Sequence, residues 1–116
     1  MSNSFKEGLN NLRELSNGDE AFVDEMLEIF LRTTPKTLSE IDKGFQNADP
    51  EHIAAYAHKL KSSLQVMGND ELKQLTKNLE HGARQGHELS ALQAFFDRLQ
   101  EQMNKLNSSI EEKLTN

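Results

Sequence analysis

The sequence predicts an all-α protein, folded as an antiparallel up-and-down four-helix bundle with an additional N-terminal helix. Apolar residues recur at steps of three and four along most of the 116-residue chain, which is the spacing of helices that bury one face. With two prolines, one tyrosine and few β-branched runs, little of the chain suits a sheet. The segments between the apolar stripes are short, and short loops join antiparallel neighbours.

The first predicted helix runs from about Phe5 to Leu15 and places Leu9 and Leu12 on its apolar face. An Asn-Gly pair follows at positions 17–18. Because asparagine and glycine tolerate the left-handed conformation that commonly ends a helix, we expect the first helix to end there.

Asp19 is predicted to cap a second helix, since its carboxylate can accept hydrogen bonds from the free N–H groups of the first turn. The apolar pattern continues on both sides of Pro35. Because the residue before a proline resists the helical conformation, we expect a bend or a short break there. The apolar residues of this segment are Phe22, Val23, Met26, Leu27, Ile29, Phe30, Leu38, Ile41 and Phe45.

A third helix should begin at Asp49 and Pro50, which suit the cap and the first helical position. The segment 68–70 closes this helix and opens a fourth, which we expect to end between Gly82 and Gly86. The stripe of the third helix comprises Ile53, Ala57, Leu60, Leu64 and Met67, and that of the fourth comprises Leu72, Leu75 and Leu79.

The last and longest helix is predicted to begin near Glu88 or Ser90. Its apolar residues alternate at steps of four and three, and this average of 3.5 residues fits a left-handed twist. From Ser108 onward the sequence is mostly polar, so we expect the end of this helix to fray. We expect one domain over residues 1–116, with its core at about 5–113. The stripe is Leu92, Phe96, Leu99, Met103, Leu106 and Ile110.

Composition excludes several function classes. The chain has no cysteine, so disulfides and thiolate metal sites are unavailable. Its 19 acidic and 13 basic residues give a formal net charge of −6, which argues against binding to nucleic acid or an anionic membrane. No apolar run approaches the roughly 20 residues that span a bilayer, and the N-terminus lacks the order of a secretory signal. We therefore expect a cytoplasmic protein, and a monomer.

The sequence carries no sign of an enzyme with its own nucleotide site. It has neither a Gly-rich phosphate loop nor a Gly-x-Ser-x-Gly elbow. The histidines at 52, 58, 81 and 87 form no pair at the three- or four-residue spacing that places two metal ligands on one helix face. We therefore predict no metal site and no cofactor bound by this chain.

His58 is the candidate functional residue. It lies one position off the apolar stripe of the third helix, so its side chain should stand at the surface beside the core. Lys61 and Ser62 follow one turn later on the same side. A neutral imidazole has one ring nitrogen free to act as a nucleophile, and the nearby cation suits an incoming anionic group.

The hexapeptide 58–63, His-Lys-Leu-Lys-Ser-Ser, followed by Gly68, resembles the phosphorylation motif of the histidine-containing phosphotransfer (HPt) domain family of two-component phosphorelays. That motif has an apolar residue two positions after the histidine, a lysine three positions after it, then small residues and a glycine. The resemblance extends over nearly the whole chain. Glu80 and Arg84 fall where family members often carry a polar and a basic residue facing the histidine.

The resemblance implies that His58 carries a phosphoryl group between aspartates of receiver domains, without autokinase activity. Lys61, helped by Arg84, would neutralise phosphoryl charge, and Glu80 would orient the imidazole through its other nitrogen. Ser62 would leave room for the partner's active site. The implied partners are response-regulator receiver domains and a hybrid histidine kinase, and the receiver would supply the aspartate and Mg²⁺.

Two positions depart from the family pattern. Ser62 stands where glycine is more frequent, and Gln65, on the same face as His58, stands where a small residue is usual. The Gln65 amide could bond the phosphoryl group, or it could narrow the choice of partner. Glu80 and Arg84 are four residues apart, so they could also simply pair along their helix.

Other readings stay open at this level. The chain could be an HPt-like adaptor that binds a receiver or kinase without being phosphorylated, although the intact histidine and lysine disfavour this. It could also be the phosphotransfer domain of a larger hybrid kinase. Related domains dock receivers through apolar residues of their first two helices, which makes some otherwise core-like positions candidates for an exposed patch. These positions are Leu12, Leu15, Phe22 and Met26.

Overall fold

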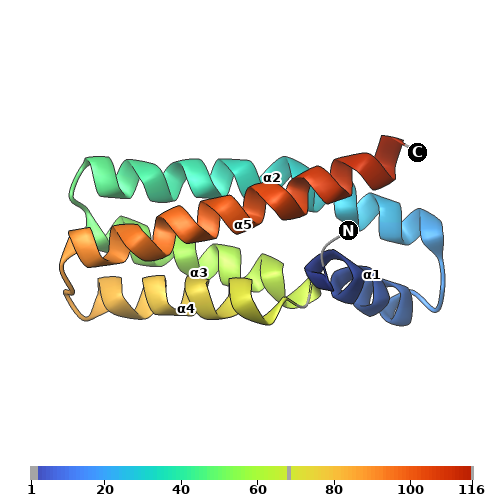
Figure 1. Cartoon of the computed structure of the whole chain (residues 1–116), viewed down its shortest axis with the longest axis horizontal. Coiled ribbons are helices and arrows are strands. Elements are labelled where there is room, and N and C mark those ends of the chain that lie inside the picture. The colour runs from blue at the N-terminus through green and yellow to red at the C-terminus, as the bar shows by residue number, and fades with distance from the viewer. Residues whose placement is uncertain (1–2, 68, 116) are drawn as a thin grey trace.

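The computed structural model describes residues 3–67 and 69–115, with side chains from Phe5 onward, and it contains five helices and no strand in those residues. Helices α2 to α5 run antiparallel to their neighbours in sequence and form one bundle, and α1 lies across one end of it (Figure 1). This confirms the predicted fold class. The helices are α1 (Asn3–Leu15), α2 (Glu20–Gln46), α3 (Pro50–Met67), α4 (Asp70–Arg84) and α5 (Leu89–Thr115).

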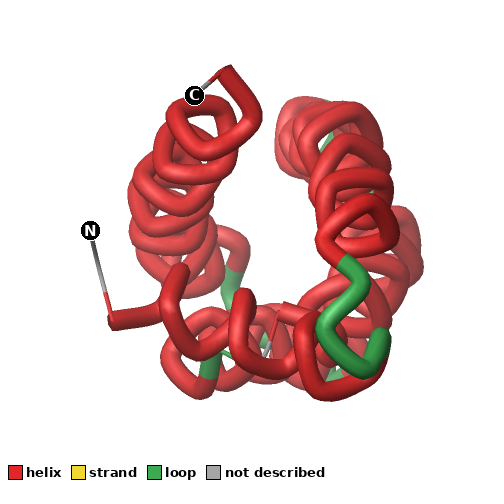
Figure 2. Tube along the Cα trace, turned by 90° about the vertical axis from the view of Figure 1, so that its right-hand side faces the viewer, coloured by secondary structure: helices red, strands yellow, loops and turns green. Residues whose placement is uncertain are grey.

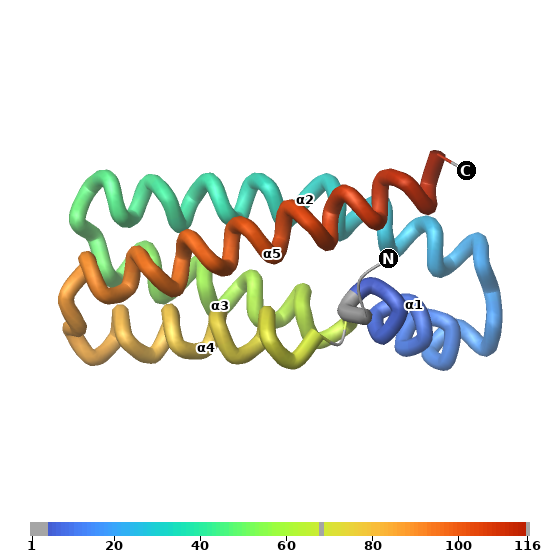
Figure 3. The backbone as a smooth tube through the Cα atoms, viewed as in Figure 1, coloured from blue at the N-terminus to red at the C-terminus, as the bar shows by residue number. Residues whose placement is uncertain are grey.

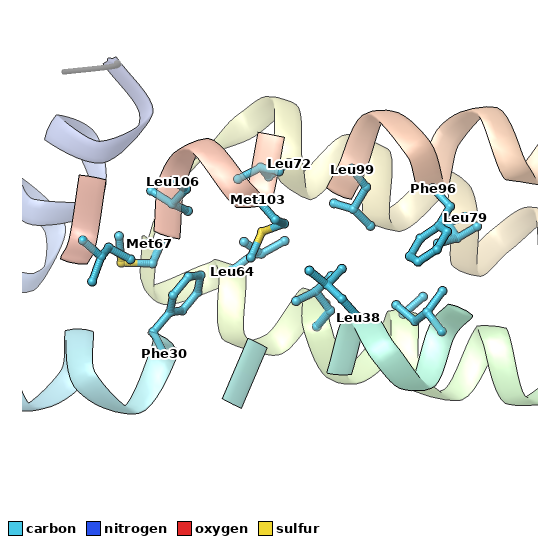
Figure 4. Close-up of a cluster of buried hydrophobic side chains, with 14 of the residues drawn as sticks. Phe30, Leu38, Leu64, Met67, Leu72, Leu79, Phe96, Leu99, Met103 and Leu106 are labelled. Carbon is cyan, nitrogen blue, oxygen red and sulfur yellow. The ribbon is translucent and has the colours of Figure 1, made fainter. Parts of the chain in front are cut away.

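The bundle is elongated, with principal extents of 43 × 22 × 20 Å, and the view along its length shows the helices grouped around one axis (Figure 2). Side chains from α2, α3, α4 and α5 meet in a continuous apolar interior (Figure 4). The predicted stripe of α3 is buried along its whole length, whereas Leu75 of α4 is only partly buried. Burial of one entire face of α3 fixes which side of that helix faces solvent.

Side chains cap the starts of three helices. Asp19 accepts hydrogen bonds from the N–H groups of the first turn of α2 at 3.1 and 3.3 Å. Asp49 accepts from the N–H of His52 at 3.2 Å, and Asn69 accepts from the N–H of Leu72 at 2.9 Å. The predicted caps at Asp19 and Asp49 are confirmed. Each such cap contributes about 1 kcal/mol to helix stability.

We predicted a bend or a short break at Pro35; helix α2 continues through this residue, so there is no break. A proline inside a helix removes one backbone hydrogen bond and costs about 3 kcal/mol. Two threonines in the preceding turn donate their hydroxyls to backbone oxygens: Thr33 to Ile29 at 2.9 Å, and Thr34 to Phe30 at 2.8 Å. Apolar residues on both sides of the proline are buried in the same core, and this packing outweighs the local cost.

The end of α5 is also ordered, so the predicted fraying from Ser108 is wrong. The helix extends to Thr115, and Ile110 is fully buried. Lys113 Nζ lies 2.6 Å from Oδ1 of Asp24, at the start of α2. In the chain trace, α5 crosses the bundle obliquely and its last turns lie beside the first half of α2 (Figure 3). These contacts join segments far apart in sequence, which local polarity does not reveal.

Candidate functional site

His58 stands on the solvent side of α3. Its neighbour Ala57 and the next stripe residue, Leu60, are fully buried, and they hold the helix against the core. The His58 side chain is 57% exposed. The position predicted from the apolar stripe is therefore the one observed.

One nitrogen of the His58 ring is held by the neighbouring helix. Nδ1 lies 3.0 Å from Oε2 of Glu80 on α4. An ionised carboxylate can only accept, so Nδ1 carries the proton and donates it to Glu80. In the neutral ring, Nε2 then has the free lone pair, and in the described part of the chain no group bonds to it.

Glu80 joins three side chains. Besides accepting from His58, it contacts Lys61 Nζ through Oε1 at 3.1 Å. Its Oε2 accepts from Arg84, whose Nη2 and Nε lie at 3.1 and 3.2 Å. The Glu80 side chain is only 11% exposed. A nearly buried carboxylate with three donors forms a fixed support under the exposed imidazole.

Two opposing effects set the charge state of Glu80. Burial raises the pKa of its carboxyl group, because it removes water from the charged form. Hydrogen bonds from Lys61, Arg84 and His58 lower that pKa, and the net pKa of Glu80 lies below its ordinary value. The carboxylate is therefore ionised at neutral pH, as the role of acceptor requires.

The remaining predicted residues lie along the same face without touching the ring. Ser62 is exposed, and its hydroxyl donates to the backbone oxygen of His58 at 3.4 Å, a long bond. Gln65 is exposed one turn further on. His58, Ser62 and Gln65 form an exposed ridge along α3, which we call the α3 ridge. Gly68 of the motif lies outside the described residues.

A groove opens on each side of the α3 ridge. The first, between α1, α2 and α3, is mostly apolar and has a volume of about 90 Å³, which is too small for a typical small-molecule ligand. We call it the apolar groove. It is lined by Leu12, Met26, Ile29, Phe30, Thr33, Ser63, Val66 and Met67.

The patch candidates divide between core and surface. Leu12 is buried, whereas Leu15 is 70% and Phe22 39% exposed, and Met26 is partly buried at the apolar groove. Ile29 is 37% exposed. The sequence predicted it only as an apolar residue of the second helix, not as a candidate for the patch.

The second groove, between α3 and α4, is polar, and we call it the lysine groove. It is lined by Lys61, Gln65, Asp70, Lys73, Gln74 and Lys77. Sequence reasoning missed Lys73 and Lys77. Their spacing to Glu80 and Arg84, in steps of four, three and four, places all four on one face of α4 and could have revealed them.

The other histidines have no part in this cluster. His52 contacts Oε2 of Glu40 at 3.2 Å and packs on Tyr56, and His81 and His87 are exposed. Across residues 3–67 and 69–115, no three acidic or histidine side chains are grouped so as to hold a metal ion. No helix in that part of the chain is both long and apolar enough to cross a membrane.

Comparison with known proteins gives two matches. Residues 25–109 match the family described as Hpt domain. The fold resembles the crystal structure of the HPT domain from an Hpt sensor hybrid histidine kinase of Shewanella, with a TM-score of 0.79, 19% sequence identity, and 92% of each chain covered. At this identity the likeness concerns the fold alone. No curated protein matches the chain.

Proposed function

Because the chain belongs to the Hpt domain family, whose members carry phosphoryl groups in two-component signalling, we propose that it is a phosphorelay intermediate. It accepts a phosphoryl group on His58 from an aspartate of one receiver domain and passes it to an aspartate of another. Hpt domains are phosphocarriers rather than enzymes, and they interact with receiver domains and histidine kinases. For this chain we propose transfer without autokinase activity.

The observation that supports this proposal is the asymmetry of the His58 ring. Nδ1 is bonded to Glu80, while the ring as a whole is 57% exposed. The nucleophilic atom is therefore Nε2, which a partner protein can reach from solvent. A histidine serving only to pack or to pair would not need this combination of a fixed ring and a free nitrogen.

The transfer step needs no proton to leave the ring. The Nε2 lone pair attacks the phosphorus of the aspartyl phosphate, and the bond from phosphorus to the aspartate oxygen breaks with its electrons. A bond between nitrogen and phosphorus forms, the aspartate leaves as a carboxylate, and the ring becomes positively charged with its proton still on Nδ1. Glu80 faces that new positive charge at 3.0 Å. Delivery to the second receiver is the reverse of this step.

Lys61 and Arg84 supply the positive charge near the phosphoryl group. Lys61 contacts Oε1 of Glu80, and Arg84 contacts Oε2, the oxygen that also accepts from the imidazole. Phosphoryl transfer depends largely on positioning and on neutralisation of charge. We propose that Lys61 turns from Glu80 toward the phosphoryl oxygens, while Arg84 keeps Glu80 in place.

The surroundings of His58 suit a docked receiver. Ser62 is small, so the partner's active site can close over the ring. The amide of Gln65 can bond the phosphoryl group, or its bulk can limit which receiver domains fit. The exposed side chains of Ile29, which lines the apolar groove, and of Phe22, one turn before Met26, give a surface for apolar contact. Mg²⁺ stays with the receiver in this scheme, and this chain contributes no ligand to it.

The test is transfer from a phosphorylated receiver domain, followed by measurement of the intact mass. We expect a gain of one phosphate that is stable to alkali and labile to acid. His58→Gln should abolish the gain, and His81→Gln, which alters another exposed histidine, should leave it unchanged. Full phosphoryl transfer to the His58→Gln variant would refute His58 as the phosphorylated residue. If the receiver binds but no phosphate is gained, the chain would instead be an adaptor that is not phosphorylated.

A further inference from the structure

The α3 ridge separates two surfaces of different chemistry. The apolar groove lies toward α1 and α2, where Ser63 and Val66 of α3 contribute to its wall. The lysine groove lies toward α4, where Lys61 and Gln65 of α3 contribute. A protein that reaches His58 therefore meets an apolar surface on one side of it and a charged surface on the other.

The lysine groove is a positive region on an acidic protein. The groove is lined by three lysines and by one carboxylate, that of Asp70, so its net charge is two positive. The whole chain, in contrast, has a formal net charge of −6. Lys61 is already paired with Glu80. Lys73 and Lys77 form no ion pair with any described residue, so their charges are available to another molecule.

On the opposite side of the ridge, exposed carboxylates lie near the apolar groove. Glu25 and Glu28 are exposed on α2, within one turn of Ile29 at the apolar groove. Glu14 of α1 lies beside Gln65, in the hollow between α1 and α3. Arg32 is also exposed within one turn of Ile29, so the charges at the apolar groove are mixed, whereas the lysine groove has a net positive charge.

We propose that the lysine groove binds an acidic surface of the partner receiver domain and so fixes the orientation in which the receiver sits on His58. This inference rests on the proposed function, because it assumes that a receiver docks there. Complementary charges at the edge of an interface steer association and fix its register more than they add affinity. An apolar contact alone allows the receiver to bind in several orientations about the ridge. The positive charge of the lysine groove at α4 favours one of these orientations.

The shape of the groove favours a protein surface over a small anion. Lys77 and Gln74 are exposed, and Lys73 is only partly buried. Small-molecule sites enclose most of their ligand and converge on it with a few fixed polar groups. An open row of flexible lysines lacks that enclosure, but it matches a row of carboxylates on another protein.

The test compares charge variants of the full chain. The double variant Lys73→Glu with Lys77→Glu reverses the charge of these two side chains in the groove. The double variant Lys73→Gln with Lys77→Gln only removes that charge. The matched control, Lys36→Glu with Lys105→Glu, makes the same change in net charge at exposed residues of α2 and α5 that line neither groove. Circular dichroism verifies that each variant is folded.

The probe is the purified receiver domain that binds the unaltered chain most tightly within a panel of receivers. At low salt, the association rate constant should fall on the order of tenfold for the glutamate pair, by less for the glutamine pair, and little for the control. The differences should shrink near 1 M salt, where charges are screened within about 3 Å. An unchanged rate for the glutamate pair, or an equal fall in the control, would overturn the proposal.

A second arm separates this inference from the proposed function. Phosphoramidate, a small chemical phosphoryl donor, needs no docked protein, so it should phosphorylate the groove variants as it does the unaltered chain. If neither phosphoramidate nor a phosphorylated receiver labels the unaltered chain, the proposed function fails, while the association rates still decide the role of the groove. If no receiver in the panel binds, the proposed partner is wrong and the groove proposal fails with it.

Discussion

Glu80 on α4 holds Nδ1 of His58 on α3 at 3.0 Å, which leaves the lone pair of the neutral ring on Nε2. The same carboxylate also binds Lys61 and Arg84. One nearly buried group thus fixes the tautomer of the His58 ring and holds the side chains of Lys61 and Arg84. Its contribution to transfer can be separated from its contribution to folding.

Glu80→Gln should slow phosphotransfer by about tenfold, because it removes a charge-assisted hydrogen bond of roughly 1.5 kcal/mol to the ring that becomes positive. Nitrogen NMR of the imidazole should show the proton shared between Nδ1 and Nε2 in the variant, instead of residing on Nδ1. Glu71→Gln, on the same helix but paired with Arg98, is the control. An unchanged tautomer in Glu80→Gln would contradict the positioning role.

Lys61→Ala should slow transfer by about tenfold to a hundredfold while leaving the helix content intact. The reason is that one cation facing the phosphoryl oxygens is lost, and Lys61 is only 32% exposed, so water screens its charge incompletely. Stopped-flow transfer rates give the measurement. Lys59→Ala is the matched control, since Lys59 lies near the ring of Tyr56 rather than Glu80. Equal rates for the two variants would remove Lys61 from the mechanism.

The lowered pKa of Glu80 predicts a loss of stability in acid. Burial alone would raise this pKa, but the bonds from Lys61, Arg84 and His58 bring it below its ordinary value. A carboxyl group whose pKa is lower in the folded state stabilises the fold above its unfolded pKa, about 4.3, and that contribution disappears as the pH falls through the folded value.

Urea unfolding between pH 7 and pH 3 measures this loss. The free energy of unfolding should fall less in Glu80→Gln than in the unaltered chain over the acid range. Some loss should remain in the variant, because a bond from Arg13 also lowers the pKa of Glu20, and a bond from Lys43 lowers that of Glu40. If the free energy of unfolding falls equally with pH in both proteins, the ionised carboxylate of Glu80 does not stabilise the fold.

The periodic apolar pattern was enough to predict the bundle, because burying one face of each helix leaves few other arrangements. It failed where distant contacts override local preference. Pro35 does not break α2, since residues on both sides of it are anchored in one core, and Lys113 holds the polar end of α5 to Asp24. Neither contact is visible in a local window of sequence.

The candidate site, like the fold, was predictable only where local spacing decides the outcome. His58 lies one position off the apolar stripe of its own helix, which predicted an exposed side chain, and the structure confirms that exposure. The bonds from Glu80 to three side chains depend on how α3 and α4 are placed side by side, which the spacing within one helix does not specify. Lys73 and Lys77 were missed because a lysine on a helix face is ordinarily a solvated residue.

Leu64→Ala should reduce the free energy of unfolding by about 2–5 kcal/mol, because it leaves a cavity in the core under the α3 ridge. Leu64 is fully buried and packs with residues of the neighbouring helices (Figure 4). Leu15→Ala removes the same atoms from a side chain that is 70% exposed, and its effect should stay within about 0.5 kcal/mol. Chemical denaturation measures both, and similar losses would contradict the assigned core.

The bond from Lys113 to Asp24 couples the last turns of α5 to the first turns of α2. Asp24 is two residues from Phe22 and from Met26, so the end of α5 braces the turns of α2 that carry the exposed Phe22 and the groove residue Met26. We therefore expect that a substitution of Lys113 alters the apolar groove without any change near the imidazole.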